Sequence, residues 1–402
     1  MTEPLELDLA AIRAEFPALG DGRAYLDAAA GTQTPESVIS AIAAAYRQGL
    51  SNTDGFFPSS QLAGEIVAAC REAVADLVGG VPQGVVLGPN MTTLTYKFSR
   101  LLAAEWNPGD EIVISQLEHD GNFRPWIQAA VRAGVTVRVA KVDLESGELP
   151  TAQYEELIGP RTRLVAVTAA SNVLGTRPDV AAITTLAHRE GARTYVDGVH
   201  ATPHMPVDVN QLEADFYVTS AYKWCGPHVG ALVASPELLD GLRPDKLVPA
   251  SDLVPDRFQT GTPPLADYAG VTAAVEHLAG LAGPSSGTRR QRLLRAMAAV
   301  ESSEARLFRL MLDALEELPA VRVYGHAERQ APTAYFTVAG FAPDVVAARL
   351  AAQGVNVWSG DNYAYEVTMA LGLEPQGAVR AGLVHYNDYS DVDRLIAALH
   401  QL

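Results

Sequence analysis

Short apolar runs alternate with longer stretches in which apolar residues recur at helical spacing. Runs of this length are typical of buried strands, and the longer periodic stretches are typical of helices that cover a sheet. The predicted strands lie at 85–88, 111–115, 135–142, 164–168, 194–197, 216–219 and 229–234. The predicted helices lie at 5–16, 35–48, 61–78, from after Thr93 to Ala104, and at 126–133, 151–158 and 180–190. This alternation predicts an α/β fold with a large, mainly parallel sheet covered by helices.

The pattern changes towards the C-terminus. Residues 244–262 are predicted to be rich in loops, and the glycine-bounded segment 283–287 is predicted to be a hinge. A long helix is expected at 289–318, then strands at 333–338, 355–358 and 379–386 and helices at 343–353 and 390–402, with Ser390 as the last N-cap. We therefore expect a large domain over 21–285, and a small α/β domain formed by 1–20 and 286–402.

Composition limits the class of protein. The chain has 402 residues, a net charge of −17 and two cysteines. The acidic balance argues against binding to nucleic acid or an anionic membrane, and two cysteines cannot build a disulfide framework. No signal peptide and no apolar run of membrane-spanning length is visible, so a cytoplasmic protein is expected.

The segment from Ser220 to His228, SAYKWCGPH, places a lysine between two apolar runs. Burying an unpaired ammonium is costly, and lysine is the residue that forms a Schiff base with a carbonyl cofactor. A surface lysine whose stem packs on apolar neighbours explains this segment alone equally well.

A second segment favours the cofactor. The predicted strand ending at Asp197 places a carboxylate at a strand end, where open α/β sheets bind ligands. Pyridoxal phosphate needs a lysine for its aldehyde and a carboxylate for its pyridine nitrogen. Lys223 and Asp197 supply both groups.

The segments VDGVHATPH and TSAYKWCGPHVGAL resemble the class V aminotransferase and cysteine desulfurase family, pyridoxal-phosphate enzymes of fold type I. SNVLGT (171–176), LEHDGNFRPW (117–126), QTGTPP (259–264) and VRAGLVHYNDYSDVDRL (379–395) resemble it too. These anchors run from about residue 25 to the C-terminus, and their combination is specific where each alone is weak.

The resemblance assigns roles residue by residue. It implies that Lys223 and Asp197 act in catalysis and that His119 stacks on the cofactor ring. Further cofactor contacts are implied for Thr92, Thr93, Asn172, His200, Ser220, Tyr222 and Thr262. Tyr222 replaces the histidine of many relatives, and His200 the glutamine usual in desulfurases. Read from the residues alone, Thr92 and Thr93 are equally compatible with plain helix caps.

The substrate side of the site carries one clear candidate and one departure. A guanidinium pairs with a carboxylate in a bidentate way, and the family's matching arginine implies that Arg380 binds the substrate carboxylate. Tyr363 stands where a desulfurase needs a mobile cysteine, while Cys70 and Cys225 lie in a helix and in the lysine segment. We assign Tyr363 and Phe56 to the substrate site. Thr262 and the 52–60 loop resemble segments that reach across a homodimer interface; a surface loop explains 52–60 equally well.

Several reactions stay open for a family member without that cysteine. We expect an amino acid or cysteine S-conjugate as substrate and β-elimination as the reaction, as in carbon–sulfur lyases of actinobacterial antibiotic and thiol pathways. Decarboxylation-coupled oxidative deamination or transamination is the alternative. A desulfurase is less favoured, because its cysteine nucleophile is absent. A non-catalytic cofactor-binding protein is also less favoured, because such proteins usually carry a DNA-binding module ahead of this part, whereas here the first anchor is near residue 25 and the net charge is −17.

Overall fold

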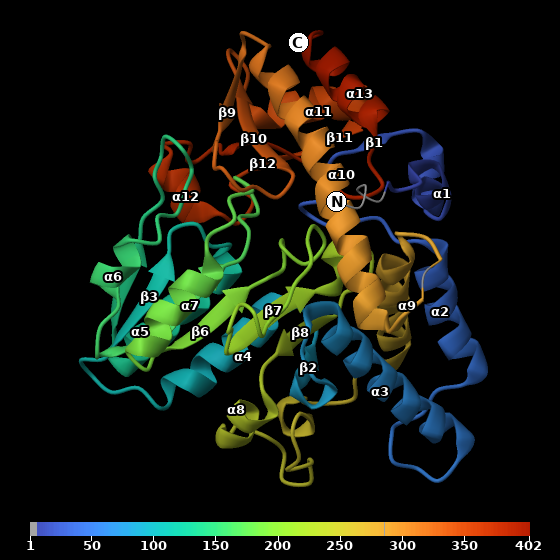
Figure 1. Ribbon diagram of the computed structural model, residues 1–402, viewed down its shortest axis with the longest axis vertical. Coiled ribbons are helices and arrows are strands. Elements are labelled where there is room, and N and C mark those ends of the chain that lie inside the picture. Colours follow the sequence, from blue (N-terminus) through green and yellow to red (C-terminus); the bar gives the residue numbers. More distant parts are fainter. Residues whose placement is uncertain (1–5, 285) are drawn as a thin grey trace.

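The computed structural model describes residues 6–284 and 286–402, and Figure 1 shows a larger lower part and a smaller upper part. The lower part holds a seven-stranded sheet. Its order is β2 (Val85–Gly88), β8 (Gly230–Val233), β7 (Phe216–Ser220), β6 (Arg193–Asp197), β5 (Thr162–Thr168), β3 (Glu111–Ser115) and β4 (Thr136–Ala140). Among the described strands of this sheet, β8 alone runs opposite to the other six, so the predicted mainly parallel sheet of a fold type I enzyme is confirmed.

Both faces of this sheet are buried, because helices cover both. Ile112 and Ile114 of β3 pack in one core with Phe98 and Trp126, whereas Val113 packs in the other. Alternate side chains of a strand point to opposite faces, so a strand covered on both faces is apolar throughout. This explains why the central strands were readable as continuous apolar runs.

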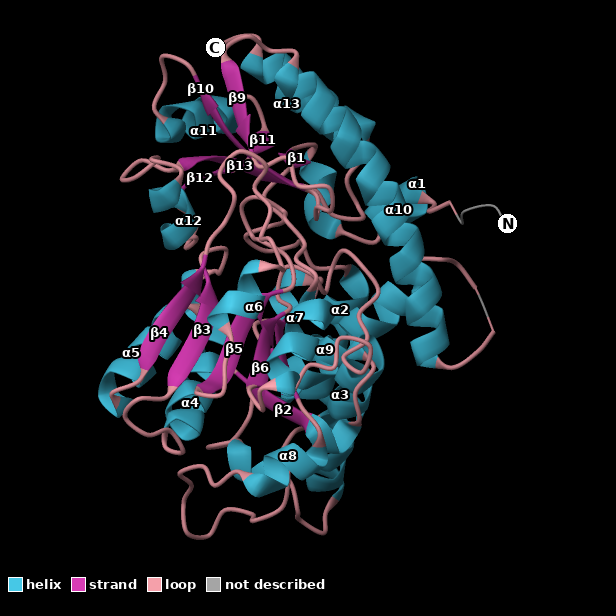
Figure 2. Ribbon diagram, turned by 60° about the vertical axis from the view of Figure 1, so that its left-hand side comes forward, coloured by secondary structure: helices cyan, strands magenta, loops and turns pink. Residues whose placement is uncertain are grey.

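Helices pack beside the strands in both the lower and the upper part (Figure 2). They are α1 (Leu9–Ala14), α2 (Glu36–Gln48), α3 (Pro58–Val78), α4 (Met91–Ala103), α5 (Arg124–Ala133), α6 (Gln153–Leu157), α7 (Val180–Arg189), α8 (Pro236–Gly241), α9 (Leu265–Gly280), α10 (Arg289–Glu316), α11 (Pro343–Ala352), α12 (Tyr365–Ala370) and α13 (Tyr389–Leu399). Short 3-10 turns lie at η1 (Pro17–Asp21), η2 (Pro82–Gly84), η3 (Asp120–Asn122), η4 (Ala221–Lys223) and η5 (Asp256–Phe258). Among the described residues, no helix has the length and apolarity needed to cross a bilayer.

The upper part holds a four-stranded antiparallel sheet in the order β12 (Trp358–Gly360), β13 (Ala378–Gly382), β10 (Thr333–Val338) and β9 (Val321–Tyr324). Beside it, β1 (Ala24–Tyr25) pairs in parallel with β11 (Val355–Asn356). The long helix α10 runs from the lower part into the upper part (Figure 1). The exact domain boundaries stay a prediction, and the predicted 1–20 segment and 283–287 hinge include residues outside the described ranges.

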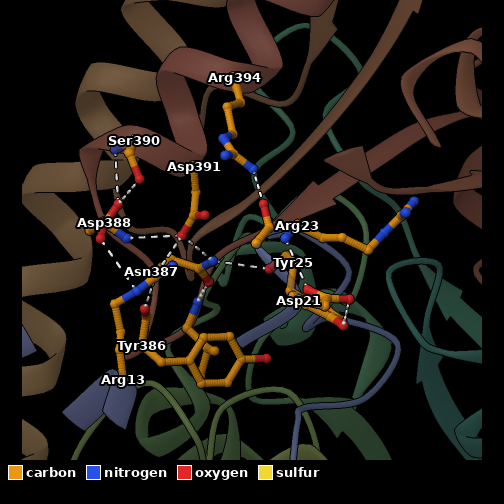
Figure 3. A network of polar contacts seen from close by, with 12 residues as sticks. Arg13, Asp21, Arg23, Tyr25, Tyr386, Asn387, Asp388, Ser390, Asp391 and Arg394 are labelled. Atoms are coloured by element: carbon orange, nitrogen blue, oxygen red, sulfur yellow. Dashed lines mark hydrogen bonds and ion pairs between the residues drawn. The ribbon is translucent and has the colours of Figure 1, made fainter. Parts of the chain in front are cut away.

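Polar contacts tie the N-terminal segment to the C-terminal helix (Figure 3). Arg13 donates from Nη1 to Asp391 Oδ2 at 2.9 Å and to the Tyr386 carbonyl at 2.8 Å. The Asn387 amide donates to the Tyr25 carbonyl and to Asp391, both at 3.0 Å. The chain after β13 is therefore held in place by residues from both ends of the sequence.

Some predicted element bounds were wrong. The 379–386 strand ends at Gly382, because the chain then turns and Asn387 Oδ1 accepts from the Val384 amide at 2.9 Å. Ser390 does not cap the last helix. Asp388 does, because its carboxylate accepts from the Ser390 amide at 2.9 Å. The first helix is shorter than expected, beginning at Leu9 with Asp8 as cap, and the predicted start at residue 5 lies outside the described residues.

Candidate active site

A cavity of about 860 Å³ lies between the seven-stranded and the four-stranded sheet, at the carboxyl ends of β6 and β7. It gathers most of the residues that the sequence singled out. These are Thr92, Thr93, His119, Asn172, Asp197, His200, Ser220, Tyr222, Lys223, Tyr363 and Arg380. Phe56 and Thr262 lie outside the lining, and both side chains are exposed to solvent.

Lys223 ends the 3-10 turn that follows β7, and its amine faces the cavity. Its Nζ donates to the carbonyl of Ala29, in the segment that follows β1. Burial and, to a smaller extent, the Arg380 charge lower the pKa of Lys223 to about 7, against the opposing effect of Asp197. A substantial fraction of the amine is therefore uncharged at neutral pH, as a nucleophile or base requires.

Asp197 is the last residue of β6, and it is buried. Its Oδ1 accepts from the Val199 amide at 2.9 Å. Burial raises the pKa of Asp197 to about 6, while this hydrogen bond and the Lys223 charge oppose the rise. A buried carboxylate at this strand end is suited to hold a cationic ring nitrogen, because such a partner restores the charge balance that burial disturbs.

The N-terminus of α4 opens onto the same cavity. Asn90 caps it by accepting the Thr93 amide at 2.9 Å, and Ser220 Oγ accepts the Met91 amide at 2.9 Å. Thr92 and Thr93 line the cavity at this helix end. Amides, hydroxyls and the helix dipole together make a site for an anion such as a phosphate.

His119 lies above this end of the site as an uncharged ring. Its Nδ1 accepts from the Gly121 amide at 2.9 Å, so this nitrogen carries no proton. Burial, together with the charges of Lys223 and Arg380, lowers the pKa of His119 to about 3. Its ring stacks on that of Tyr363, with centroids 5.5 Å apart. A flat neutral ring that lines the cavity is suited to contact an aromatic cofactor.

The four-stranded sheet forms the opposite wall of the cavity. Arg380 lies in β13, buried, and donates from Nη1 to the Asn172 carbonyl at 3.0 Å. Among the described residues this is the one hydrogen bond found for its guanidinium, so its remaining donors are available to a ligand. Burial lowers the pKa of Arg380 to about 10, which still leaves it cationic.

Asn172 and His200 stand between the two walls. The Asn172 amide donates to the Asn362 carbonyl at 2.8 Å, while its Oδ1 is buried without a partner in the described chain. His200 Nε2 lies 2.9 Å from Thr333 Oγ1. Buried polar atoms are normally paired, so the unpaired amide oxygen indicates that a ligand completes this part of the site.

Several lining residues were not predicted. Arg124 also faces the cavity, but it is held at 2.8 Å by both Asp120 and Glu366, so its charge is already paired. His228 stacks on Tyr222 at a centroid distance of 4.8 Å, and Trp358 enters from β12. Arg124 and His228 lie within the quoted motifs, whereas no sequence signal marks Trp358.

Neither cysteine reaches the cavity. Cys70 lies in α3 and Cys225 behind the lysine turn; both are fully buried and neither belongs to the lining. Burial raises the pKa of the Cys225 thiol to about 12. The cavity instead receives Tyr363, which is 71% exposed and has a left-handed backbone with φ 60°.

Comparisons with known proteins agree with this geometry. Residues 24–395 match the family described as "Aminotransferase class-V". An uncharacterized Mycobacterium tuberculosis protein, MT3887, is 37% identical over 98% of this chain and 99% of its own length. A cysteine desulfurase from Klebsiella pneumoniae is 33% identical over 97% of each chain. The crystal structure of the Escherichia coli cysteine desulfurase CsdA superposes with a TM-score of 0.87 at 30% identity over 98% of each chain.

The chain therefore belongs to the class V aminotransferase family. It is a pyridoxal-phosphate-dependent enzyme of the cysteine desulfurase-like type, with the fold that those enzymes share. Its own residues fit the cofactor: an amine for the aldehyde, a buried carboxylate for the ring nitrogen, a helix N-terminus for the phosphate and an unpaired amide for the ring substituents.

Proposed function

We propose that this enzyme cleaves the carbon–sulfur bond of a cysteine S-conjugate, or of a related amino acid, by β-elimination. One observation carries the proposal: the cavity combines the Lys223 amine with the Arg380 guanidinium but receives no thiol. A cysteine desulfurase transfers sulfur to a protein thiolate, which must be accessible and stabilised by its surroundings. Both cysteines here are buried, and burial raises the pKa of each thiol.

Different residues of the cavity would hold different parts of the cofactor. Asp197 would pair with its ring nitrogen and His119 would stack on its ring, while Thr92, Thr93 and Ser220 would hold its phosphate. Asn172 and His200 would contact its phenolic oxygen, and Tyr222 would border its phosphate end. Bound pyridoxal phosphate supplies an electron sink that stabilises negative charge at the substrate α-carbon.

Lys223 and Arg380 act on the amino acid itself. The guanidinium binds and orients the substrate carboxylate, and the uncharged Lys223 amine takes the α-proton. The electron pair of that C–H bond forms a double bond to the β-carbon, and the sulfur leaves with the C–S pair as a thiolate. Hydrolysis of the remaining fragment gives pyruvate and ammonia. Loss of the carboxylate as carbon dioxide would give up its ion pair with Arg380, which favours elimination over decarboxylation.

A substrate labelled at its carboxyl carbon tests which bond breaks. The cofactor-loaded enzyme is incubated with a cysteine S-conjugate, and the label is measured in pyruvate and in carbon dioxide. We expect it in pyruvate, with one thiol released per pyruvate. Label in carbon dioxide would favour decarboxylation-coupled oxidative deamination, and a keto acid that retains its sulfur would favour transamination. Either result would overturn β-elimination.

We further propose a homodimer in which Thr262 and Phe56 complete the site of the partner subunit. The support is that both are exposed, and that Phe56 is a large aromatic side chain left entirely in solvent. Isologous interfaces of obligate dimers bury such groups. A fully active monomer by light scattering at micromolar concentration would contradict this. A cytoplasmic location, and a role in antibiotic or thiol metabolism, stay predictions.

A further inference from the structure

Behind the lysine turn lies a second group of titratable side chains, and none of them lines the cavity. It consists of Cys225, His277 of α9 and His385, which follows β13. All three are buried, and one ligand atom of each lies within 4.8 Å of the other two. This Cys–His–His cluster therefore joins three distant parts of the chain at one point.

The spacing within the cluster is close to that of a tetrahedral metal site. The Nε2 atoms of His277 and His385 are 3.2 Å apart, and Cys225 Sγ is 3.9 Å from His385 Nε2. Around a tetrahedral zinc ion, two nitrogen ligands would be about 3.3 Å apart and a sulfur–nitrogen pair about 3.6 Å. The Cys225 Sγ lies within 4.8 Å of the ligand nitrogen of His277, so the thiol moves towards that ring by up to about 1.2 Å when the three atoms share one ion.

The carboxylate of Glu15 fixes the direction of one ligand. Its Oε2 lies 2.9 Å from His277 Nδ1, so this nitrogen donates a proton to the carboxylate. In the neutral ring, Nε2 then carries a lone pair directed at the cluster. Metal-bound histidines typically make this carboxylate contact through their other nitrogen.

The backbone at Cys225 supplies a separate observation. Its φ is 67°, a left-handed conformation that a β-carbon disfavours, although Gly226 follows immediately. The Cys225 amide donates to Thr32 Oγ1 at 2.7 Å, and this contact holds the turn. Strained residues of this kind persist where the surrounding structure fixes them, and they gather at functional sites. In this conformation the thiol Sγ lies 3.9 Å from His385 Nε2.

The charge of the cluster also suits a divalent cation. The carboxylates of Glu15 and Glu304 are both close enough to act electrostatically on the Cys225 thiol. Glu304 is paired with His204 at 2.9 Å, which leaves Glu15 as the carboxylate beside the cluster. A divalent ion, one thiolate and the Glu15 carboxylate sum to zero charge. Sulfur and imidazole donors select zinc over magnesium or calcium, which prefer oxygen.

We propose that Cys225, His277 and His385 bind one zinc ion, with Glu15 hydrogen-bonded behind His277. A small ligand such as water takes the fourth position. On binding, the thiol proton is released to solvent and a zinc–sulfur bond forms, with no change of oxidation state. The ion would pin the lysine turn to α9 and to the C-terminal segment that Figure 3 shows anchored at Asn387 and Asp391.

Metal analysis tests the site without reference to turnover. Cofactor-loaded protein from zinc-supplemented cells is dialysed against a chelator and its metal content is measured. We expect about one zinc per chain in wild type and in Cys70→Ala, the matched buried cysteine, and at least a tenfold loss in Cys225→Ala. Equal zinc in Cys225→Ala and wild type would place the metal elsewhere and overturn the proposal.

A second measurement covers the case in which Cys225→Ala does not fold. Wild type is unfolded, freed of metal and refolded with cobalt(II), which reports a thiolate ligand through a sulfur-to-metal charge-transfer band. We expect that band in wild type and in Cys70→Ala, and its loss in His277→Gln and His385→Gln. Refolded wild type that binds no metal, or binds cobalt without the band, would overturn the proposal.

Discussion

The two sides of one turn, Lys223 to Cys225, differ in almost every physical respect. The front of the turn is the side that faces the cavity of about 860 Å³. There, Lys223 and Arg380 keep polar atoms available to a ligand. On the rear, Cys225, His277 and His385 are sealed from solvent and contact one another. Trp224 separates the two sides, buried, with its ring nitrogen bonded to Thr219 Oγ1 at 3.0 Å.

The difference separates two uses of burial. On the front, burial moves the pKa of Lys223 to about 7, close to the pH at which it must exchange protons. On the rear, burial encloses the Cys225 thiol together with two imidazole nitrogens, which are ligands for a cation. Changes on the front should therefore alter chemistry, whereas changes on the rear should alter metal content and stability.

The largest expected effect comes from Lys223→Ala. Turnover should fall by about 10²–10⁴-fold, because both the base and the point of cofactor attachment are lost. Borohydride should no longer fix the cofactor covalently, as peptide mapping would show. Removing a buried amine should leave the stability of the cofactor-free protein equal or higher. Lys141→Ala, at an exposed lysine, is the control. Unchanged turnover in Lys223→Ala would refute the assignment of the front.

The second effect distinguishes the two arginines of the cavity. Arg380→Ala should lower kcat/KM at least about tenfold, since a charge-assisted hydrogen bond contributes about 1.5–3 kcal/mol. Arg124→Gln should cost less, because Asp120 and Glu366 already pair with that charge. Steady-state kinetics on one amino-acid substrate measures both. Equal losses, or a greater loss at Arg124, would show that the carboxylate binds at the other arginine.

A third prediction concerns the Lys223 amine of the cofactor-free protein. Only the neutral amine attacks an aldehyde, so the rate of cofactor incorporation should rise with pH through about 7 and level off above it. Arg380 lowers this pKa and Asp197 raises it. The midpoint should therefore move up in Arg380→Ala and down in Asp197→Asn. A midpoint near that of a free lysine in wild type would mean that the amine is not desolvated.

The smallest expected effect is at Tyr363, whose ring stacks on His119. An aromatic pair contributes about 0.5–1.5 kcal/mol, so Tyr363→Ala should raise KM by no more than about tenfold. Tyr363→Phe keeps the ring and should match wild type. If the phenylalanine variant loses as much as the alanine variant, the hydroxyl rather than the stacking acts on the substrate.

The sequence predicted the central sheet well, because its strands are apolar on both faces and short. It missed α9. Buried residues lie all round this helix, so its sequence lacks the alternation of apolar and polar positions that identifies an amphipathic helix. It also missed β9, a partly exposed edge strand, and α12. The predicted 355–358 strand splits because β11 pairs with β1 while β12 pairs with β13. The pairing of strands that are distant in the sequence cannot be predicted from the local pattern of apolar residues.

The residues of the candidate site also differ in whether the sequence could predict them. Lys223 and Asp197 were predictable because each stands at the end of an apolar strand. Trp358 was not, since nothing local distinguishes it from a surface residue. The rear cluster was invisible because Glu15, Cys225, His277 and His385 share no spacing motif, and only the folded chain brings them together.

The fate of the sulfur tests the central claim most directly. Cofactor-loaded wild-type enzyme is given free cysteine and, separately, a cysteine S-conjugate, and mass spectrometry follows both the products and the intact protein. We predict that the conjugate yields its thiol with the substituent intact, together with pyruvate and ammonia, and that the protein mass stays unchanged. Alanine as the product, with a persulfide on Cys70 or Cys225, would contradict the account and identify the enzyme as a desulfurase.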